Sequence, residues 1–171
     1  MNQWGSTMQL NRKPTRLQGY DYNQNGFYFI TICTKDRQCL LSSVVGADDP
    51  GSPHIELKKT GKIVENNINK MNEIYADISV ESFVIMPNHV HLLVNSSCSL
   101  KGSPRSSTPT NQISKFVAAF KKFTEKEAGF KLWQRGFYDH IIRNEEDYLY
   151  HLQYIAENPK KWLMGKDEYY A

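Results

Sequence analysis

The chain has 171 residues, of which 40% are hydrophobic, and a formal net charge of +3. This length suits one domain with a sizeable core, which we expect to span residues 1–171, and it is too short for two. The mildly basic charge neither requires nor excludes a nucleic-acid partner. Three cysteines without a Cys-x-x-Cys pair argue against a disulfide framework and a zinc ribbon, and no apolar run is long enough to span a membrane. We therefore expect a cytoplasmic protein with no membrane partner.

The first half of the chain predicts strands, a hairpin and one helix. Phe27–Thr34 is rich in aromatic and β-branched residues, as a central strand would be. Cys39–Leu57 contains short apolar runs around a Gly/Pro/Asp cluster, which indicates a hairpin with a loose loop. Apolar residues recur at helical spacing from Thr60 to Tyr75. Two strands follow, Ile78–Met86 and His89–Val94, joined by a turn at a Pro-Asn pair.

The second half predicts a loop, a helix, a last strand and a final helix. Residues 95–111 form a Ser/Pro/Gly/Thr tract that is too polar to pack, and we expect a flexible loop there. From Ile113 an apolar stripe lies opposite a lysine-rich face, which indicates a helix, and Phe137–Arg143 has the pattern of a strand. The order βαββαβ followed by a helix predicts an α+β fold. Its antiparallel sheet would carry helices on one face and an appended C-terminal helix.

Two histidines stand inside the apolar, β-prone run Val84–Val94. His89 and His91 are two residues apart, so in a strand both imidazoles leave the same face while Val90, Leu92 and Val94 take the other. Two neutral imidazoles side by side supply half of a divalent-metal site. A metal would need a third donor, and a surface-facing pair at a strand end is the alternative.

The C-terminal helix has a start and a stop in its sequence. Asn144 is a good N-cap, three acidic residues fill the first turn, and Pro159 closes the run, so the helix is predicted over about Glu145–Asn158. At 3.6 residues per turn its residues divide into an apolar face and a polar stripe. The apolar face comprises Tyr148, Leu149, Leu152, Ile155 and Ala156. The polar stripe comprises Asp147, His151, Tyr154 and Asn158.

Tyr154 and Asn158 are neighbours one turn apart on the polar stripe. Together they could serve one small site, with the phenol as nucleophile and the amide oxygen as a metal ligand. The alternative is a solvated helix face opposite a core face. Tyr148 and Tyr150 are rival nucleophiles, but Tyr148 falls on the apolar face and Tyr150 has no such amide one turn later.

Three blocks, PNHVHLLV, WQRGFYDHIIRNEEDY and QYIAENP, occur in this order and spacing. Together they resemble the single-tyrosine HUH nuclease superfamily, and within it the transposases of the REP-associated tyrosine type. The resemblance extends from about Arg16 to about Leu163. It implies a ferredoxin-like or RRM-like sandwich, with the histidines on a central strand and the nucleophile on the final helix.

The resemblance also implies roles for the residues at the matching positions. His89 and His91 would bind Mg²⁺ or Mn²⁺, Tyr154 would attack a DNA phosphate, and Asn158 would complete the metal shell. Related enzymes often have glutamine at the last position, so Asn158 is a shorter variant. The implied activity is metal-dependent cleavage and transfer of single-stranded or hairpin DNA. It proceeds through a 5′-phosphotyrosine intermediate and keeps a free 3′-hydroxyl for rejoining.

Cationic side chains flank the expected site and are candidates for contact with DNA phosphates. Some of them belong to a basic N-terminal arm over about residues 1–19. The DNA-binding candidates are Arg12, Lys13, Arg16, Lys115, Lys121, Lys122, Arg135, His140 and Arg143. His140 could instead be a structural histidine, and Trp133 fits the core better than a stacking platform for bases.

We therefore expect a DNA transposase, a site-specific single-strand endonuclease. Two alternatives stay open: a DNA- or RNA-binding module of the same fold without catalysis, and a metal-dependent phosphoesterase that uses water as the nucleophile. The intact set of His89, His91, Tyr154 and Asn158 argues against the first. The sequence leaves open the DNA site that is recognised and the choice between a monomer and a homodimer.

Overall fold

The computed structural model describes residues 25–46, 53–97 and 112–166. The expected N-terminal arm, and with it Arg12, Lys13 and Arg16, lies outside these residues. No helix within the described part is both long and apolar enough to cross a membrane. The described elements, in chain order, are β1 Gly26–Cys33, the short 3₁₀ helix η1 Lys35–Arg37, β2 Ser42–Val45, β3 His54–Leu57, α1 Lys59–Ile74, β4 Ile78–Ile85, β5 His89–Ser96, α2 Gln112–Ala128, β6 Tyr138–Ile142 and α3 Glu145–Leu163.

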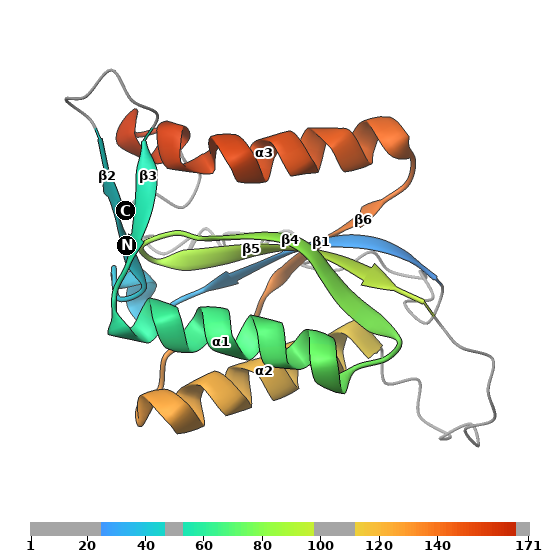
Figure 1. Cartoon of the computed structure of the whole chain (residues 1–171), viewed down its shortest axis with the longest axis horizontal. Coiled ribbons are helices and arrows are strands. Elements are labelled where there is room, and N and C mark those ends of the chain that lie inside the picture. Colours follow the sequence, from blue (N-terminus) through green and yellow to red (C-terminus); the bar gives the residue numbers. More distant parts are fainter. Residues whose placement is uncertain (1–24, 47–52, 98–111, 167–171) are drawn as a thin grey trace, which may run out of the picture.

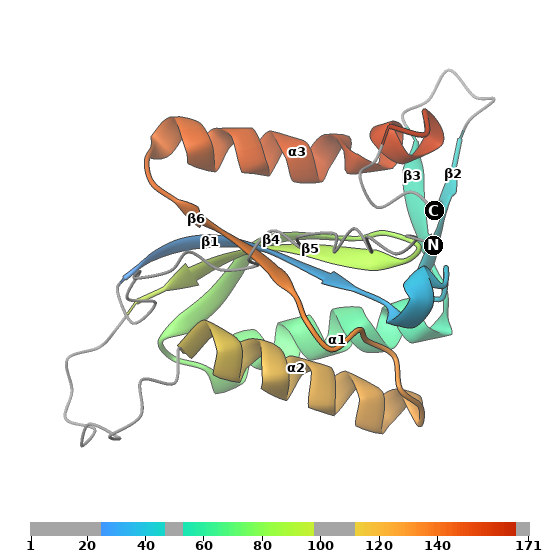
Figure 2. The ribbon, with the colours of Figure 1, turned by 180° about the vertical axis from the view of Figure 1, so that it is seen from behind.

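Four of the strands form one antiparallel sheet in the order β4-β5-β1-β6, and β2 pairs with β3 in a separate ribbon. Helices α1 and α2 cover one face of the larger sheet, and α3 lies across the other (Figure 1). Seen from behind, β6 rises from the α2 side and leads directly into α3 (Figure 2). The α+β sandwich with an appended C-terminal helix is therefore confirmed, and α3 covers the face that α1 and α2 leave open.

The sheet separates two hydrophobic cores. Alternate residues of β5, beginning with Val90, pack against β1, α1 and α2 on one side. A smaller cluster on the other side includes Leu93 of β5 and Ile155 of α3. Because successive side chains of a strand point to opposite faces, His89 and His91 share the face of Leu93 and lie under α3.

Two element boundaries differ from the sequence expectation by more than one residue. Strand β5 runs to Ser96, which pairs with both β1 and β4, so the start of the expected 95–111 loop belongs to the sheet; residues 98–111 lie outside the described part. Helix α3 continues to Leu163 instead of ending before Pro159. A proline inside a helix removes one N–H donor and crowds the preceding turn. Here Pro159 is buried against the remainder of the fold, and its packing offsets that loss.

Candidate active site

His89 and His91 lie side by side beneath α3. Both belong to the central strand β5 and both are fully buried, so the alternative of a surface-facing pair is wrong. Their Nε2 atoms are 3.1 Å apart. Two donor atoms that each lie about 2.1 Å from one cation, with a donor–cation–donor angle of roughly 90°, are about 3 Å apart. The spacing of the two imidazoles therefore fits one shared divalent cation.

Each imidazole is held through its other ring nitrogen. Nδ1 of His89 lies 2.7 Å from Oδ1 of Asn88. Nδ1 of His91 lies 2.8 Å from Oγ1 of Thr31. An amide oxygen only accepts, so His89 carries its proton on Nδ1 and presents a lone pair on Nε2; the hydroxyl of Thr31 can accept from His91 in the same way. Such partners fix the tautomer and ring orientation of metal-binding histidines.

Burial keeps both imidazoles neutral. It lowers the pKa of His89 to about 3, against an opposing contribution from Asn158 and with a further small lowering from Arg37. The pKa of His91 is lowered well below its usual value, first by burial and then by the nearby His89 and His151. A metal ion binds the deprotonated imidazole. Both rings therefore have the required protonation state at neutral pH.

Asn158 is fully buried next to His89. Its amide raises the pKa of that histidine, yet neither Oδ1 nor Nδ2 reaches a hydrogen-bonding partner of ordinary geometry within the described part of the chain. A buried polar group left unsatisfied costs about 1–3 kcal/mol. The Oδ1 atom thus has the position and the available lone pairs that a third cation ligand needs.

Of the three tyrosines near the start and middle of α3, Tyr154 lies against the histidine pair. Its half-buried ring meets His91 edge-on, with the ring centroids 5.3 Å apart. Tyr148 instead packs edge-on against Phe27 at 5.0 Å. Tyr150 is 61% exposed, and its ring lies 6.4 Å from that of Tyr154. The packing therefore favours Tyr154 over both rivals as the group next to the candidate cation site.

The continuation of α3 beyond Pro159 brings two further side chains to the site. Nζ of Lys161 lies over the ring of Tyr154, 4.3 Å from its centroid. The rings of Trp162 and His89 have centroids 6.1 Å apart. A helix that ended before Pro159 would not carry these residues in register with Tyr154. Sequence reasoning missed them because it placed the helix end at the proline.

The side of α3 that faces the sheet is largely the polar stripe. His151, Ile155 and Asn158 are buried, whereas Leu149 is 53% and Leu152 is 37% exposed. The alternative of a solvated polar stripe opposite an apolar core face is therefore wrong. The apolar cluster on this side takes Ile155 and the partly buried Tyr148, Tyr154 and Trp162 from α3, while the polar groups of the stripe meet histidines of the sheet.

A second polar cluster ties β6 to the first turns of α3. Nε2 of His140 lies 2.9 Å from Oδ2 of Asp147. Nδ1 of His151 lies 2.8 Å from the carbonyl oxygen of Asp147 and 3.1 Å from its Oδ1. Ligand atoms of these three residues all lie within 4.8 Å of one another, so the group could hold a metal ion. The sequence shows the four-residue spacing of Asp147 and His151, but their meeting with His140 depends on the fold.

A basic groove of about 1210 Å³ lies between α2 and residues 129–137. Six cationic residues line it against two acidic ones: Lys35, Lys121, Lys122, Lys126, Lys131 and Arg135, with Asp36 and Glu125. Three of the DNA-binding candidates are thus brought together. Two others, Lys115 and Arg143, are exposed but lie outside the groove, and His140 pairs with Asp147.

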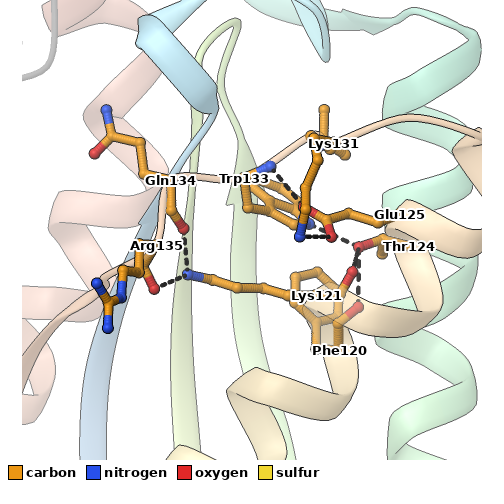
Figure 3. Close-up of polar contacts among 9 residues, drawn as sticks. Phe120, Lys121, Thr124, Glu125, Lys131, Trp133, Gln134 and Arg135 are labelled. Atoms are coloured by element: carbon orange, nitrogen blue, oxygen red, sulfur yellow. Dashed lines mark hydrogen bonds and ion pairs between the residues drawn. The ribbon is translucent and has the colours of Figure 1, made fainter.

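Lys121 is engaged by the protein itself. Its ammonium donates to the carbonyl oxygens of Gln134 at 2.8 Å and Arg135 at 3.4 Å (Figure 3). It also donates to the carbonyl oxygen of Gly136 at 2.7 Å, so it joins α2 to the segment that leads into β6. Burial lowers the pKa of Lys121 to about 8, with opposing contributions from neighbouring groups. Nearby, Trp133 is 5% exposed and donates its Nε1–H to Oγ1 of Thr124 at 2.7 Å, which confirms its place in the core.

No protein-family model matches the chain. An uncharacterized protein of Haemophilus influenzae is 32% identical to it over 169 residues, which is 88% of this chain and 89% of that relative. A putative REP-associated tyrosine transposase of the same organism is 26% identical over 152 residues, 82% of this chain and 74% of the relative. A REP-associated tyrosine transposase of Escherichia coli is 30% identical over 82 residues, 48% of this chain and 44% of the relative.

Among solved structures, that of a REP-associated tyrosine transposase bound to a REP hairpin matches the fold. Its TM-score is 0.57 at 23% sequence identity, and the match covers 80% of this chain and 67% of the other. The two proteins therefore share the arrangement of the antiparallel sheet and its helices.

We expect the stability of the folded protein to fall as the pH drops from about 6.5 towards 3. In that window the unfolded chain binds protons at His89 and His91 that the folded protein excludes, because both pKa values are lowered by folding. Each histidine contributes a slope of up to about 1.4 kcal/mol per pH unit. Denaturant unfolding at several pH values, with a chelator present, should give a smaller slope for His89→Gln than for the wild type.

The matched control for this measurement is His54→Gln, because the side chain of His54 on β3 is 61% exposed. It should leave the slope unchanged. An equal slope in His89→Gln and wild type would contradict a buried, neutral His89.

Proposed function

This chain belongs to the REP-associated tyrosine transposases, and from this we propose that it cleaves and transfers DNA strands with Tyr154 as the nucleophile. The proposed substrate is single-stranded or hairpin DNA, and the proposed cofactor is Mg²⁺ or Mn²⁺. One observation carries the proposal: three candidate cation ligands, His89, His91 and Asn158, are buried together next to that tyrosine.

The Nε2 atoms of His89 and His91 and Oδ1 of Asn158 would hold the cation. Oxygen donors from the Asn158 amide, from phosphate and from water suit Mg²⁺ and Mn²⁺, and the two imidazoles would supply the nitrogen donors at the remaining positions. When bound, the cation polarises the scissile phosphate and neutralises charge that builds on its oxygens. The protein's own contribution is to keep the two imidazoles neutral and oriented, and to shield all three donors from water, before the DNA arrives.

Tyr154 replaces one phosphate ester bond with another. Its phenolic oxygen forms a bond to phosphorus while the bond from phosphorus to the 3′-oxygen breaks. The phenol loses its proton, and the departing 3′-oxygen takes up a proton to become a hydroxyl. The enzyme is left with a 5′-phosphotyrosine, and attack by a 3′-hydroxyl reverses the exchange without a nucleotide cofactor. Lys161 contributes a positive charge where the anionic phosphate meets the ring.

We propose that the DNA backbone follows the basic groove and reaches Tyr154 around the edge strand β6. Phe137 lines the groove, and the next residue, Tyr138, lines a pocket beside Tyr154. Exposed Lys122 is suited to phosphate contact, whereas Lys121 shapes the groove through its backbone carbonyl partners. The relative of known structure is bound to a REP hairpin, which supports hairpin DNA as the substrate.

The variant Tyr154→Phe removes the attacking oxygen and leaves the ring packed against His91. We expect strand cleavage and the covalent protein–DNA species to fall by more than about 1,000-fold, with the fold and the DNA affinity unchanged. The measurement is a denaturing gel after incubation with hairpin DNA and Mn²⁺, together with thermal unfolding and a binding titration.

Tyr148→Phe and Tyr150→Phe are matched controls, and both should keep the covalent species. If Tyr150→Phe removed it while Tyr154→Phe did not, the nucleophile would be misassigned. If all three variants cleaved normally and His89→Ala did not, water would be the nucleophile and the protein would be a hydrolase. A protein that binds hairpin DNA but never cleaves it would be the binding module without catalysis.

A second prediction concerns the cation. Asn158→Leu removes the amide at similar volume and should weaken Mn²⁺ binding by about 10- to 100-fold. Asn158→Asp supplies a carboxylate, which these cations prefer, and should tighten it. Calorimetry with and without an oligonucleotide measures both, and the wild-type affinity should rise when DNA phosphate adds further oxygens.

His54→Ala is the control for nonspecific binding, because its exposed side chain lies on β3. Wild-type affinity in both Asn158 variants would remove Asn158 from the ligand set. Wild-type affinity in His89→Ala would remove the basis of the whole site.

A third prediction concerns the groove. The double variant Lys122→Ala/Lys126→Ala should weaken hairpin binding and reduce the dependence of log affinity on log salt by about 0.9 for each phosphate that the variant no longer neutralises. Lys59→Ala/Lys62→Ala on α1 changes net charge equally but lies outside the groove, and it should have little effect. Equal reductions of affinity in the two double variants would mean that net charge, not the groove, governs binding.

A further inference from the structure

A pocket of about 220 Å³ opens beside Tyr154, between the sheet and the middle of α3. Its lining includes Phe29, Tyr138 and His140 from the sheet, and Tyr150 and His151 together with Tyr154 from the helix. These residues come from β1, β6 and α3, so the pocket lies at the edge of the sheet that β6 forms.

The walls of this pocket suit an uncharged flat ring better than a phosphate. Among the residues that the structure describes, no lysine or arginine lines it. The carboxylate of Asp139 lines the pocket, and that of Asp147 lies behind two of the lining residues, His140 and His151. Both negative charges would repel an anion placed there. An aromatic ring would instead meet aromatic faces and edges on both sides. The volume lies below the roughly 300–1,000 Å³ of pockets for drug-sized ligands, so it suits one ring system and not a base pair.

The occupant of this pocket must adjoin the reacting atoms. Tyr154 and His91 both border the pocket, so a group bound there lies next to the phosphate that Tyr154 attacks. In a DNA strand, that phosphate joins two nucleosides. Tyr138 and Tyr150, which line the pocket, are 47% and 61% exposed, and exposed aromatic residues are the surfaces on which unpaired bases stack.

The pocket walls are held in place before any ligand binds. His140 is bonded to the Asp147 carboxylate, and His151 donates to the Asp147 carbonyl oxygen. The two imidazoles stack with centroids 4.7 Å apart. A site that is already ordered loses less conformational entropy when its ligand arrives.

Resting on the proposed strand-cleaving function, we propose that this pocket holds one base of the substrate strand, the base of a nucleotide adjoining the scissile phosphate. The base leaves its stack and lies against Tyr138 and Tyr150. Tyr138, Tyr150 and the histidine walls thereby position the phosphate for attack by Tyr154 and contribute to the choice of cleavage site.

The test is an abasic scan of a cleavable hairpin combined with Tyr150→Ala and Tyr138→Ala. Affinities are measured with the full-length protein carrying Tyr154→Phe, so that the DNA stays intact. Each alanine variant should weaken binding of the complete hairpin by about 5- to 100-fold. Removal of one particular base should weaken binding to the protein with an unaltered pocket by a similar factor, and the alanine variants should lose nothing further on that abasic hairpin.

Two controls accompany the scan. Tyr150→Phe keeps the stacking ring and should keep most of the affinity. Phe123→Ala removes a ring that is 42% exposed on α2, outside both the pocket and the groove. It should change the affinities for the complete hairpin and for every abasic hairpin by the same factor. If Tyr150→Ala and Tyr138→Ala weaken complete and abasic hairpins equally at all positions, or weaken neither, the pocket does not hold a base and the proposal is overturned.

Cleavage by the protein with Tyr154 intact is mapped on the same hairpin. We call a base coupled to the pocket if its removal leaves the alanine variants with no further loss of affinity. A coupled base next to the mapped phosphate supports the proposal, and a coupled base at a distant position overturns it. If no cleavage occurs but one base is coupled to the pocket, the base site stands and the strand-transfer function fails. If cleavage occurs without any coupled base, the function stands and the base site fails.

Discussion

The burial of two imidazoles between β5 and α3 is the constraint on which the rest of the site depends. His89 and His91 are fully enclosed, and their proximity and burial keep them neutral. Asn88 and Thr31 hold the two Nδ1 atoms, and the Nε2 atoms face each other at 3.1 Å. Burial therefore limits each ring to one proton, the Nδ1 partners hold that proton, and each Nε2 keeps the lone pair that a cation would use. The fold bears the cost of desolvating the two rings.

Helix α3 serves both as cover for this pair and as carrier of the reactive groups. One rigid element brings Tyr154, Asn158 and Lys161 to the same place, at separations that helical geometry sets. The continuation through Pro159 matters because it adds the last of these residues to the site. A helix is a stiffer support than a loop, so the relative positions of nucleophile and ligand change little as DNA binds.

The edge strand β6 connects the two surfaces that we assign to DNA. Before it, residues 129–137 border the basic groove, and within it Tyr138 and His140 border the pocket beside Tyr154. The groove has the charge to hold phosphates, and the pocket has the rings to hold a base. Lys121 and Asp147 fix the two ends of this segment, through backbone carbonyls and through His140 respectively. Backbone binding and base selection are thereby divided between adjoining surfaces.

The sequence by itself determined what depends on near neighbours in the chain. Strand alternation placed His89 and His91 on one face, and helical spacing set Tyr154 beside Asn158. Asn144 capped α3 as expected, and its Oδ1 accepts a hydrogen bond from the N–H of Asp147 at 2.8 Å. Only the tertiary structure decided which face of α3 turns inward, because Leu149 and Leu152 offered an equally regular apolar face. It also decided that α3 passes through Pro159, since burial of the ring outweighs a lost local hydrogen bond, and that His140 meets Asp147. Those outcomes rest on interactions between segments distant in sequence, whose energies no local pattern records.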